Sequence, residues 1–324
     1  MHKIIVITGP TAVGKTKLSI ELAKKYDGEI INADAVQVYK GLDIGSAKVT
    51  EEEKEGIPHH LLDFKEVTEE YTIYHYQKDC REKIKDIQSR NKTPILVGGT
   101  GLYIKAALYD YKLSEEKSTN TYDNLTNEEL YEELKKLDKD IIIDKDNRRR
   151  LIRAINYYKE NNESINKNKT NKLLYDVIFI GLTTDRQVLY DKINKRVDEM
   201  ISQGLLEEVK SFYDKGIKSK PLLNAIGYRE LYNYLDGNCT KEEAIEKIKQ
   251  NSRHYAKRQY TFFNHQLPVV WFETDYNNFN NTIEKVETIL LVKLLVKVKV
   301  KRKLTNILKA LLLRDYILLC LLEN

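Results

Sequence analysis

Cysteine is scarce in this chain of 324 residues, and its placement argues against two classes of protein. The three cysteines, Cys80, Cys239 and Cys320, lie far apart and form no Cys-x-x-Cys pair. This spacing disfavours a disulfide framework and the common zinc sites, and it favours a reducing compartment. No secretory signal peptide is expected, because the N-terminal apolar run leads directly into a glycine-containing turn. We therefore expect the protein to be cytoplasmic.

Long uncharged apolar runs are also lacking. The most apolar stretch, 307–322, is interrupted by Lys309, Arg314 and Asp315, so we do not expect it to span a bilayer. The apolar runs earlier in the chain have the length of buried strands rather than of membrane spans. On this basis no stable membrane association is expected.

A strong excess of one charge is lacking over most of the chain. The net charge is +5, but residues 289–324 carry eight Lys/Arg and two Asp/Glu, which leaves a net −1 for the first 288 residues. A nucleic-acid site in the main body must therefore be a local basic patch and not a property of the whole surface.

The sequence does contain a phosphate-binding loop near its N-terminus. Residues 9–16 match the pattern G-x-x-x-x-G-K-[ST], with a β-branched run before them and apolar residues at helical spacing after them. In such a loop, backbone N–H groups and a helix N-terminus bind phosphate, the lysine reaches an outer phosphate and the final hydroxyl can hold Mg²⁺. We therefore predict diphosphate or triphosphate binding, with Mg²⁺ on Thr16, by the residues Gly9, Thr11, Ala12, Val13, Gly14, Lys15 and Thr16.

Strand patterns alternate with helical patterns over much of the chain, which predicts an α/β fold with a doubly wound parallel sheet flanked by helices. A stretch that lacks strand patterns interrupts this alternation, with two predicted helices at 127–138 and 147–159. We interpret 112–174 as a small helical insertion domain. The α/β catalytic core then comprises 1–111 and 175–288.

The last residues, 289–324, form an atypical basic and apolar C-terminal tail. Residues 296–301 alternate valine and lysine, which is typical of a strand. A basic amphipathic segment of this kind could touch a nucleic acid or a membrane. We favour instead a poorly ordered extension or a shifted reading frame past the true end, because the core already has the residues that a reaction needs.

Four segments together resemble the tRNA dimethylallyltransferase (tRNA isopentenyltransferase) family in its bacterial form. They are 9–16, Asp34 with 37–48, 94–100, and the pair 227–229 with 255–259. The resemblance implies a P-loop NTPase-like fold that binds dimethylallyl diphosphate. It also implies transfer of the dimethylallyl group to N6 of adenosine 37, beside the tRNA anticodon, in tRNAs that read codons starting with U, with release of pyrophosphate.

The resemblance assigns catalytic roles to three residues. Asp34 matches the general base that removes a proton from adenine N6, and Thr100 matches a threonine that hydrogen-bonds the same amine. Arg196 matches an arginine directed at the diphosphate. The residues by themselves leave alternatives open, since Asp34 could organise Mg²⁺ or cap a turn, Thr100 could be a helix N-cap and Arg196 could be a solvated helix arginine.

Basic and aromatic residues indicate a tRNA-binding surface. One predicted helix carries a cluster of arginines at 148–153, and 257–263 interleaves cations with aromatic rings, although Phe262 and Phe263 could equally be core residues. His59 and His60 are expected to be structural, because no metal-ligand spacing surrounds them. With Asp34 and Thr100, the family resemblance implies tRNA contacts at Ala35, Val36, Gln37, Arg149, Arg150, Arg153, Asn224, Gly227, Tyr228, Arg229, Lys257, Arg258 and Gln259.

A small-molecule or nucleotide kinase that uses the same loop for ATP is the alternative function. A kinase should have an arginine-bearing lid and a pocket for a small acceptor, whereas the basic helices suit a polynucleotide better. A non-catalytic RNA-binding protein is disfavoured, because Lys15, Thr16, Asp34 and Thr100 are all present. We expect a monomer that uses Mg²⁺, and the sequence leaves open which residues form the prenyl pocket.

Overall fold

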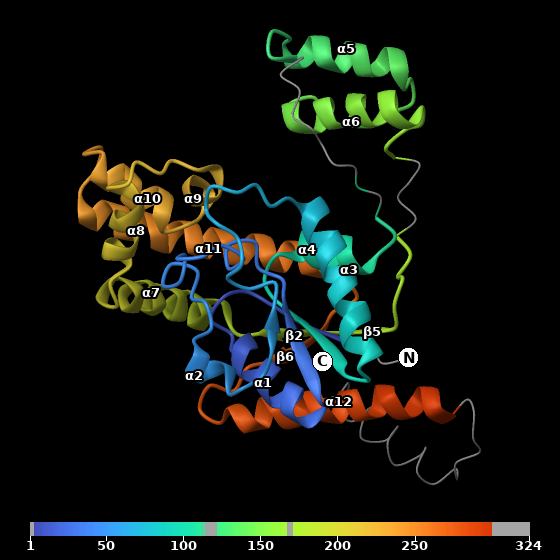
Figure 1. Ribbon diagram of the computed structural model, residues 1–324, viewed down its shortest axis with the longest axis vertical. Coiled ribbons are helices and arrows are strands. Elements are labelled where there is room, and N and C mark those ends of the chain that lie inside the picture. Colours follow the sequence, from blue (N-terminus) through green and yellow to red (C-terminus); the bar gives the residue numbers. More distant parts are fainter. Residues whose placement is uncertain (1–2, 112, 114–121, 167–170, 300–324) are drawn as a thin grey trace.

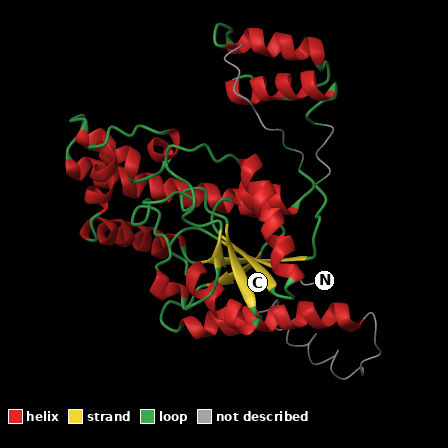
Figure 2. Ribbon diagram, in the orientation of Figure 1, coloured by secondary structure: helices red, strands yellow, loops and turns green. Residues whose placement is uncertain are grey.

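The computed structural model describes residues 3–111, 113, 122–166 and 171–299. Six parallel strands form one sheet in the order β3-β2-β4-β1-β5-β6, and helices flank it on both faces (Figures 1 and 2). The predicted α/β fold is therefore confirmed. The strands are β1 (Ile4–Thr8), β2 (Gly28–Asn32), β3 (His59–His60), β4 (Thr93–Val97), β5 (Val177–Thr183) and β6 (Val270–Glu273).

The helices fall into three groups along the chain. Those between the strands of the first half are α1 (Lys15–Lys25), α2 (Glu51–Lys54), α3 (Ile73–Ser89) and α4 (Gly101–Leu108). The insertion contributes α5 (Asn127–Leu137) and α6 (Arg148–Asn161). The second half contributes α7 (Arg186–Ser202), α8 (Leu205–Tyr213), α9 (Lys220–Asn224), α10 (Tyr228–Leu235), α11 (Lys241–Gln266) and α12 (Phe279–Lys299).

The central strand β1 separates two hydrophobic clusters. Ile4 and Val6 pack in one cluster with side chains of α3 and α4, whereas Ile5 and Ile7 pack in the other with side chains of α1 and α12. Side chains of a strand alternate between the two faces of a sheet, and helices cover both faces of this one. This double burial explains why β1 reads as a continuous apolar run, with all five of its residues buried.

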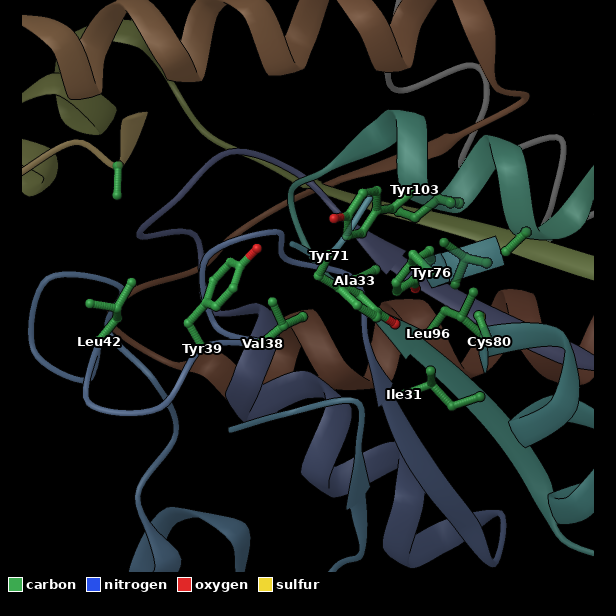
Figure 3. Packing of buried hydrophobic residues seen from close by; sticks show 14 of the residues in the cluster. Ile31, Ala33, Val38, Tyr39, Leu42, Tyr71, Tyr76, Cys80, Leu96 and Tyr103 are labelled. Carbon is green, nitrogen blue, oxygen red and sulfur yellow. The ribbon is translucent and has the colours of Figure 1, made fainter. Parts of the chain in front are cut away.

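The carboxyl end of β2 is fixed by two stacked tyrosines from different helices. The rings of Tyr76, on α3, and Tyr103, on α4, lie 4.1 Å apart at 18° (Figure 3). The hydroxyl of Tyr76 donates to the carbonyl of Asn32, at 3.0 Å. Because this bond lies at the last residue of β2, the tyrosine pair helps to set where the following loop, with Asp34, begins.

The two helices of the insertion pack on each other through a hydrophobic cluster of their own. Leu130 and Leu134 on α5 meet Leu151 and Ile155 on α6, and the pair stands away from the sheet (Figure 1). Arg148, expected in the basic cluster, instead donates to the carbonyls of residues 122 and 125. This arginine therefore ties the insertion together rather than facing solvent with its neighbours.

The helix α12 crosses the boundary predicted at 288–289. Val286 and Leu290 are fully buried in the same cluster as β1, because residues four apart share one face of a helix. The strand predicted at 296–301 is wrong as far as residue 299, since α12 continues to Lys299; residues 300–324 of the predicted tail lie outside the described residues. Within the described ranges, no helix combines the length and apolarity that a membrane span requires.

Glu29 on β2 is a buried carboxylate with three basic side chains beside it, those of Arg90, Lys92 and His60. Its side chain is 3% exposed and accepts hydrogen bonds from Arg90 and from His60, the latter at 2.8 Å, while Lys92 lies 3.3 Å away. Arg90 is the main cause of the low pKa of Glu29, about 2, with His60 and Lys92 adding to it. His60 is thus structural, as expected.

We predict that Glu29→Gln lowers the free energy of unfolding at pH 7 by about 2 kcal/mol, because the buried acceptor loses its charge-assisted hydrogen bonds to the partly exposed Arg90 and Lys92. The folded-state pKa of Glu29 lies below its unfolded value, so its contribution is present above about pH 4.5 and is lost as the pH falls towards 2. Urea unfolding at pH 7, 5 and 3 should therefore show that the free energies of unfolding of wild type and Glu29→Gln converge as the pH falls. The control Glu66→Gln, in an exposed pair with Lys40, should match wild type throughout.

Candidate functional site

A cleft of about 960 Å³ lies beyond the carboxyl ends of β1, β2 and β4. Ligands of open parallel sheets bind at this edge, because the loops that follow neighbouring strands converge there. Three loops contribute to this cleft: the phosphate loop after β1, the turn containing Asp34 after β2, and Gly98–Gly99 after β4. Loops that follow three different strands, from Thr11 in the first to Gly99 in the last, thus meet at one place.

The phosphate loop has the conformation that its glycines permit. Gly9 and Gly14 have φ angles of 133° and 90°, which favour glycine. A Cβ on Gly9 would lie 2.4 Å from the carbonyl oxygen of Leu182, and one on Gly14 would lie 2.5 Å from the ring of Phe279. Both glycines are therefore required by space as well as by backbone angle.

Two cations converge on this loop. The ammonium of Lys15 donates to the carbonyls of Gly9, at 3.1 Å, and Pro10, at 2.6 Å. Arg196 reaches the loop from α7, and its Nη1 donates to the hydroxyl of Thr11 at 2.7 Å. Sequence reasoning alone favours a solvated helix arginine at position 196, but the side chain is turned into the cleft.

The electrostatics of the loop favour an anion. Burial and the neighbouring Arg196 lower the pKa of Lys15 to about 7, and Asp34 opposes that effect. Burial also lowers the pKa of Arg196. Two cations that lose solvent and repel each other gain free energy when an anion binds between them.

Asp34 and Thr100 tie the loops after β2 and β4 together. Oδ1 of Asp34 accepts from the backbone N–H groups of Val36, at 2.9 Å, and Gln37, at 3.4 Å. The hydroxyl of Thr100 accepts from the N–H of Ala35 at 3.1 Å. Thr100 occupies the N-cap position of α4, but its side chain makes no capping bond there, and it is not among the residues that line the cleft.

The opposite wall of the cleft comes from the second half of the chain. Asn224, Gly227 and Arg229, around the start of α10, line it together with Arg258 and Gln259 of α11. Asn224 is the last residue of α9.

Gln259 connects this wall to the sheet. Its Nε2 donates to the carbonyl of Gly99 at 3.0 Å. Its Oε1 is buried without a partner within the described part of the chain. A buried acceptor of this kind is costly to leave unpaired, so a ligand N–H or O–H would be favoured there.

Tyr228 does not line the cleft, and its predicted role as a tRNA contact is not supported. Its side chain is fully buried, and its hydroxyl donates to Glu208. A Cβ on Gly45 would lie 2.5 Å from the Tyr228 ring, which shows how closely the ring packs against that loop. The aromatic ring is therefore part of the core, whereas its neighbour Arg229 faces the cleft.

A second cleft of about 890 Å³ brings the insertion close to α11. Arg150 lines it together with Lys257, Arg258 and Phe262. Arg149 is exposed outside both clefts, and Arg153 is half-buried. Of the two phenylalanines with open roles, Phe263 is fully buried in the core. Because Arg258 lines both clefts, those predicted tRNA residues that line them lie on two adjoining surfaces.

Some residues of the first cleft carry no role in the sequence reasoning. Tyr255 lines the cleft, and burial, with a smaller contribution from Asp34, raises its pKa to about 12. Ile193, Val197 and Met200 line it from α7. Together with Arg196 they occupy positions i, i+3, i+4 and i+7, which lie on one face of a helix. The sequence carries this spacing, and it could have identified the other three residues once one of the four had been assigned to the cleft.

The hydroxyl of Thr16 is the cation ligand that the phosphate-loop motif offers in the cleft. Thr16 lies in the first turn of α1 and lines the cleft beside Lys15. Among the described residues, no group of three His, Cys, Asp or Glu side chains is placed to hold a metal ion. This fits a cation such as Mg²⁺ that takes most of its ligands from phosphate oxygens and water.

These features define a P-loop α/β protein whose cleft combines a phosphate cradle with a carboxylate and a cationic second wall. The model of the IPP transferase family matches residues 37–266. The chain therefore belongs to the IPP transferase family, and the family resemblance found in the sequence is confirmed.

Relatives with known names support this membership. A protein of Anoxybacillus flavithermus named tRNA dimethylallyltransferase is 50% identical over 295 residues, covering 88% of this chain and 95% of the relative. A tRNA isopentenylpyrophosphate transferase structure from Bacillus halodurans is 42% identical with a TM-score of 0.73, covering 93% of this chain and 99% of that one. A eukaryotic dimethylallyltransferase acting on tRNA is 29% identical with a TM-score of 0.82, covering 92% and 80%.

We predict that inorganic pyrophosphate binding near pH 7 takes up about half a proton, because Lys15 has a pKa of about 7 in the free protein and a bound anion raises it. The affinity should fall as the pH rises above 7, since Lys15 must then be protonated on binding. Isothermal titration calorimetry in buffers of different ionisation enthalpy measures this uptake.

The matched control for this experiment is Lys15→Met. Pyrophosphate itself exchanges protons in the same pH range. The proton uptake measured with the variant reports this contribution of the ligand alone. An equal proton uptake in wild type and variant would mean that Lys15 does not titrate with the bound anion.

Proposed function

We propose that this protein transfers a dimethylallyl group from dimethylallyl diphosphate to N6 of adenosine 37, in tRNAs that read codons starting with U, and releases pyrophosphate. The observation that carries the proposal is the convergence of Lys15, Arg196 and Asp34 on one cleft. A leaving diphosphate requires cations, and an amine nucleophile requires a base close to them. The names of the relatives support the same reaction.

The donor diphosphate fits the phosphate loop. Charge develops on the leaving diphosphate as its C–O bond to the allylic carbon stretches. Lys15, Arg196 and the N–H groups of the loop can stabilise that charge without reorganising. Thr16 is the residue that would hold Mg²⁺, whose bound charge neutralises part of the diphosphate.

The acceptor amine needs help to react, because the lone pair of adenine N6 is delocalised into the ring. Asp34 is the group that takes the N6 proton, an effect worth roughly 10²–10⁴-fold. Its bonds to Val36 and Gln37 both use Oδ1, so we assign the proton to Oδ2. Thr100 hydrogen-bonds the same amine and holds it near the donor.

The five-carbon chain fits the apolar part of the cleft. Ile193, Val197 and Met200 extend from Arg196 along the same face of α7, and Leu205 and Ile248 complete an apolar wall. A dimethylallyl group placed there has its diphosphate within reach of Arg196. This wall excludes water from the reacting carbon, which would otherwise hydrolyse the donor.

The tRNA is held by the second wall and the adjoining cleft. Adenosine 37 must leave its stack to enter the first cleft, at a cost of a few kcal/mol that is smallest for loop nucleotides. Arg150, Lys257 and Arg258 can offset this cost through phosphates of the anticodon stem-loop. Because one chain supplies every proposed group, we propose a monomer, located in the cytoplasm with its tRNA substrate.

The proposal is tested by incubating the protein with radiolabelled dimethylallyl diphosphate, Mg²⁺ and a tRNA bearing A36-A37-A38. We expect label on adenosine 37, identified by nuclease digestion and chromatography, and none on a tRNA with guanosine at position 37. ATP-dependent phosphorylation of a small acceptor, with no label on tRNA, would instead establish the kinase alternative.

We predict that Asp34→Asn lowers kcat for transfer by about 10²–10⁴-fold while tRNA affinity stays within about twofold. Asparagine keeps an Oδ1 that can accept the backbone N–H bonds of the turn, but it cannot take the N6 proton. Single-turnover kinetics and filter binding separate the two effects. Asp34→Ala, which loses the turn as well, is the matched comparison. Equal losses of binding and turnover in Asp34→Asn would mean that the carboxylate is structural.

We predict that Met200→Ala raises kcat/KM for geranyl diphosphate relative to dimethylallyl diphosphate by about tenfold. Shortening this side chain enlarges the apolar wall, and a few added methylenes in a pocket are worth roughly 1–3 kcal/mol. The measurement is competition between the two donors on one tRNA. Leu291→Ala, an exposed residue of α12 outside the cleft, should leave the ratio unchanged. An unaltered ratio in Met200→Ala would place the prenyl chain elsewhere.

A further inference from the structure

The phosphate loop is contacted from behind by a segment that no part of the proposed chemistry uses. This segment, 274–279, connects β6 to α12 and lies beyond the residues matched by the family model. The hydroxyl of Thr274 donates to the carbonyl of Val13 at 3.0 Å, and that of Tyr276 donates to the carbonyl of Ala12 at 3.2 Å. We call 274–279 the rear brace.

The rear brace is itself held in place by the sheet and by α12. The N–H of Thr274 donates to the carbonyl of Thr183 at 2.9 Å, which continues the pairing of β5 with β6. The N–H of Asp275 donates to the hydroxyl of Thr282 at 2.8 Å. Thr274 is 5% exposed. These contacts fix the position of the brace relative to the phosphate loop.

The aromatic rings of the brace, those of Phe279 and Tyr276, make further contacts at the phosphate loop. The ring of Phe279 packs against Gly14, where a Cβ would lie 2.5 Å from it, and the ammonium of Lys17 lies 5.1 Å from the ring centroid. The ammonium of Lys192, on α7, lies 3.9 Å from the centroid of Tyr276. The brace therefore touches three successive loop residues, 12–14.

Because peptide groups are planar and trans, the hydrogen bonds to the loop carbonyls also set the direction in which the N–H groups of the loop point. In each peptide, the C=O of one residue and the N–H of the next point opposite ways. A carbonyl of Ala12 held by Tyr276 turns the N–H of Val13 away from the brace, and a carbonyl of Val13 held by Thr274 does the same for Gly14. Ala12 and Gly14 line the cleft, whereas Thr274 and Tyr276, which hold the loop carbonyls, do not.

We propose that Thr274 and Tyr276 are positioning residues that aim the N–H donors of the phosphate loop at the diphosphate. That the bound anion is a diphosphate rests on the proposed function. That the two hydroxyls set the direction of the loop N–H groups does not. Neither side chain is among those that line the cleft, so both act through the loop rather than on a substrate. The C-terminal part of the described chain is thereby required for diphosphate binding.

The test compares Thr274→Val and Tyr276→Phe, which each remove one hydroxyl, with wild type. We expect each variant to bind inorganic pyrophosphate about fivefold to tenfold more weakly by calorimetry, as for the loss of one hydrogen bond. KM for dimethylallyl diphosphate should rise by the same factor, while KM for tRNA stays unchanged. Thr274→Ser, which restores the hydroxyl, should restore the affinity.

The matched control is Thr288→Val, on the exposed side of α12, whose hydroxyl bonds within its own helix at 2.9 Å. Unchanged pyrophosphate affinity in both hydroxyl deletions would overturn the proposal, as would a loss that Thr274→Ser fails to restore. Tyr276 is half-buried, so Tyr276→Phe decides the matter if Thr274→Val does not fold. Weakened pyrophosphate binding in a protein that transfers nothing to tRNA would retain the brace and reject the proposed function.

Discussion

The convergence of two half-buried basic side chains, Lys15 and Arg196, whose charges repel each other, is the constraint on which the rest of the cleft depends. Burial and this repulsion together lower the pKa of Lys15. The arrangement persists without an anion because each cation has fixed acceptors, the carbonyls of Gly9 and Pro10 for one and the hydroxyl of Thr11 for the other. Both side chains are thus already in place for the proposed diphosphate before it binds.

The scaffold that holds these cations is assembled from the ends of three parallel strands. The order β2-β4-β1 places the loops after these strands side by side, and buried residues on both faces of β1 keep the strands in register. The stacked pair Tyr76 and Tyr103 then fixes the end of β2 (Figure 3). A carboxylate at Asp34 can face the phosphate loop only because this edge is rigid.

The second half of the chain completes the site in a different way. Helix α7 supplies Arg196 and an apolar face at once, so that the groups proposed to bind the diphosphate and its hydrocarbon chain come from adjacent turns. Helix α11 supplies Gln259, which reaches the carbonyl of Gly99. The same helix borders the second cleft, where Arg150 of the insertion lies. One helix therefore connects the reacting centre to the surface proposed for tRNA.

The sequence by itself determined the parallel α/β fold, the phosphate loop and the family, because short-range patterns encode strands, turns and glycine positions directly. Tertiary structure alone decided the direction of Arg196, the burial of Tyr228, the role of Arg148 within the insertion and the path of α12 through residue 288. These depend on which residues from distant segments meet, and a helix position facing solvent or core has the same local pattern until its neighbours are placed. The brace behind the phosphate loop likewise joins residues more than 260 positions apart, a contact that no local pattern records.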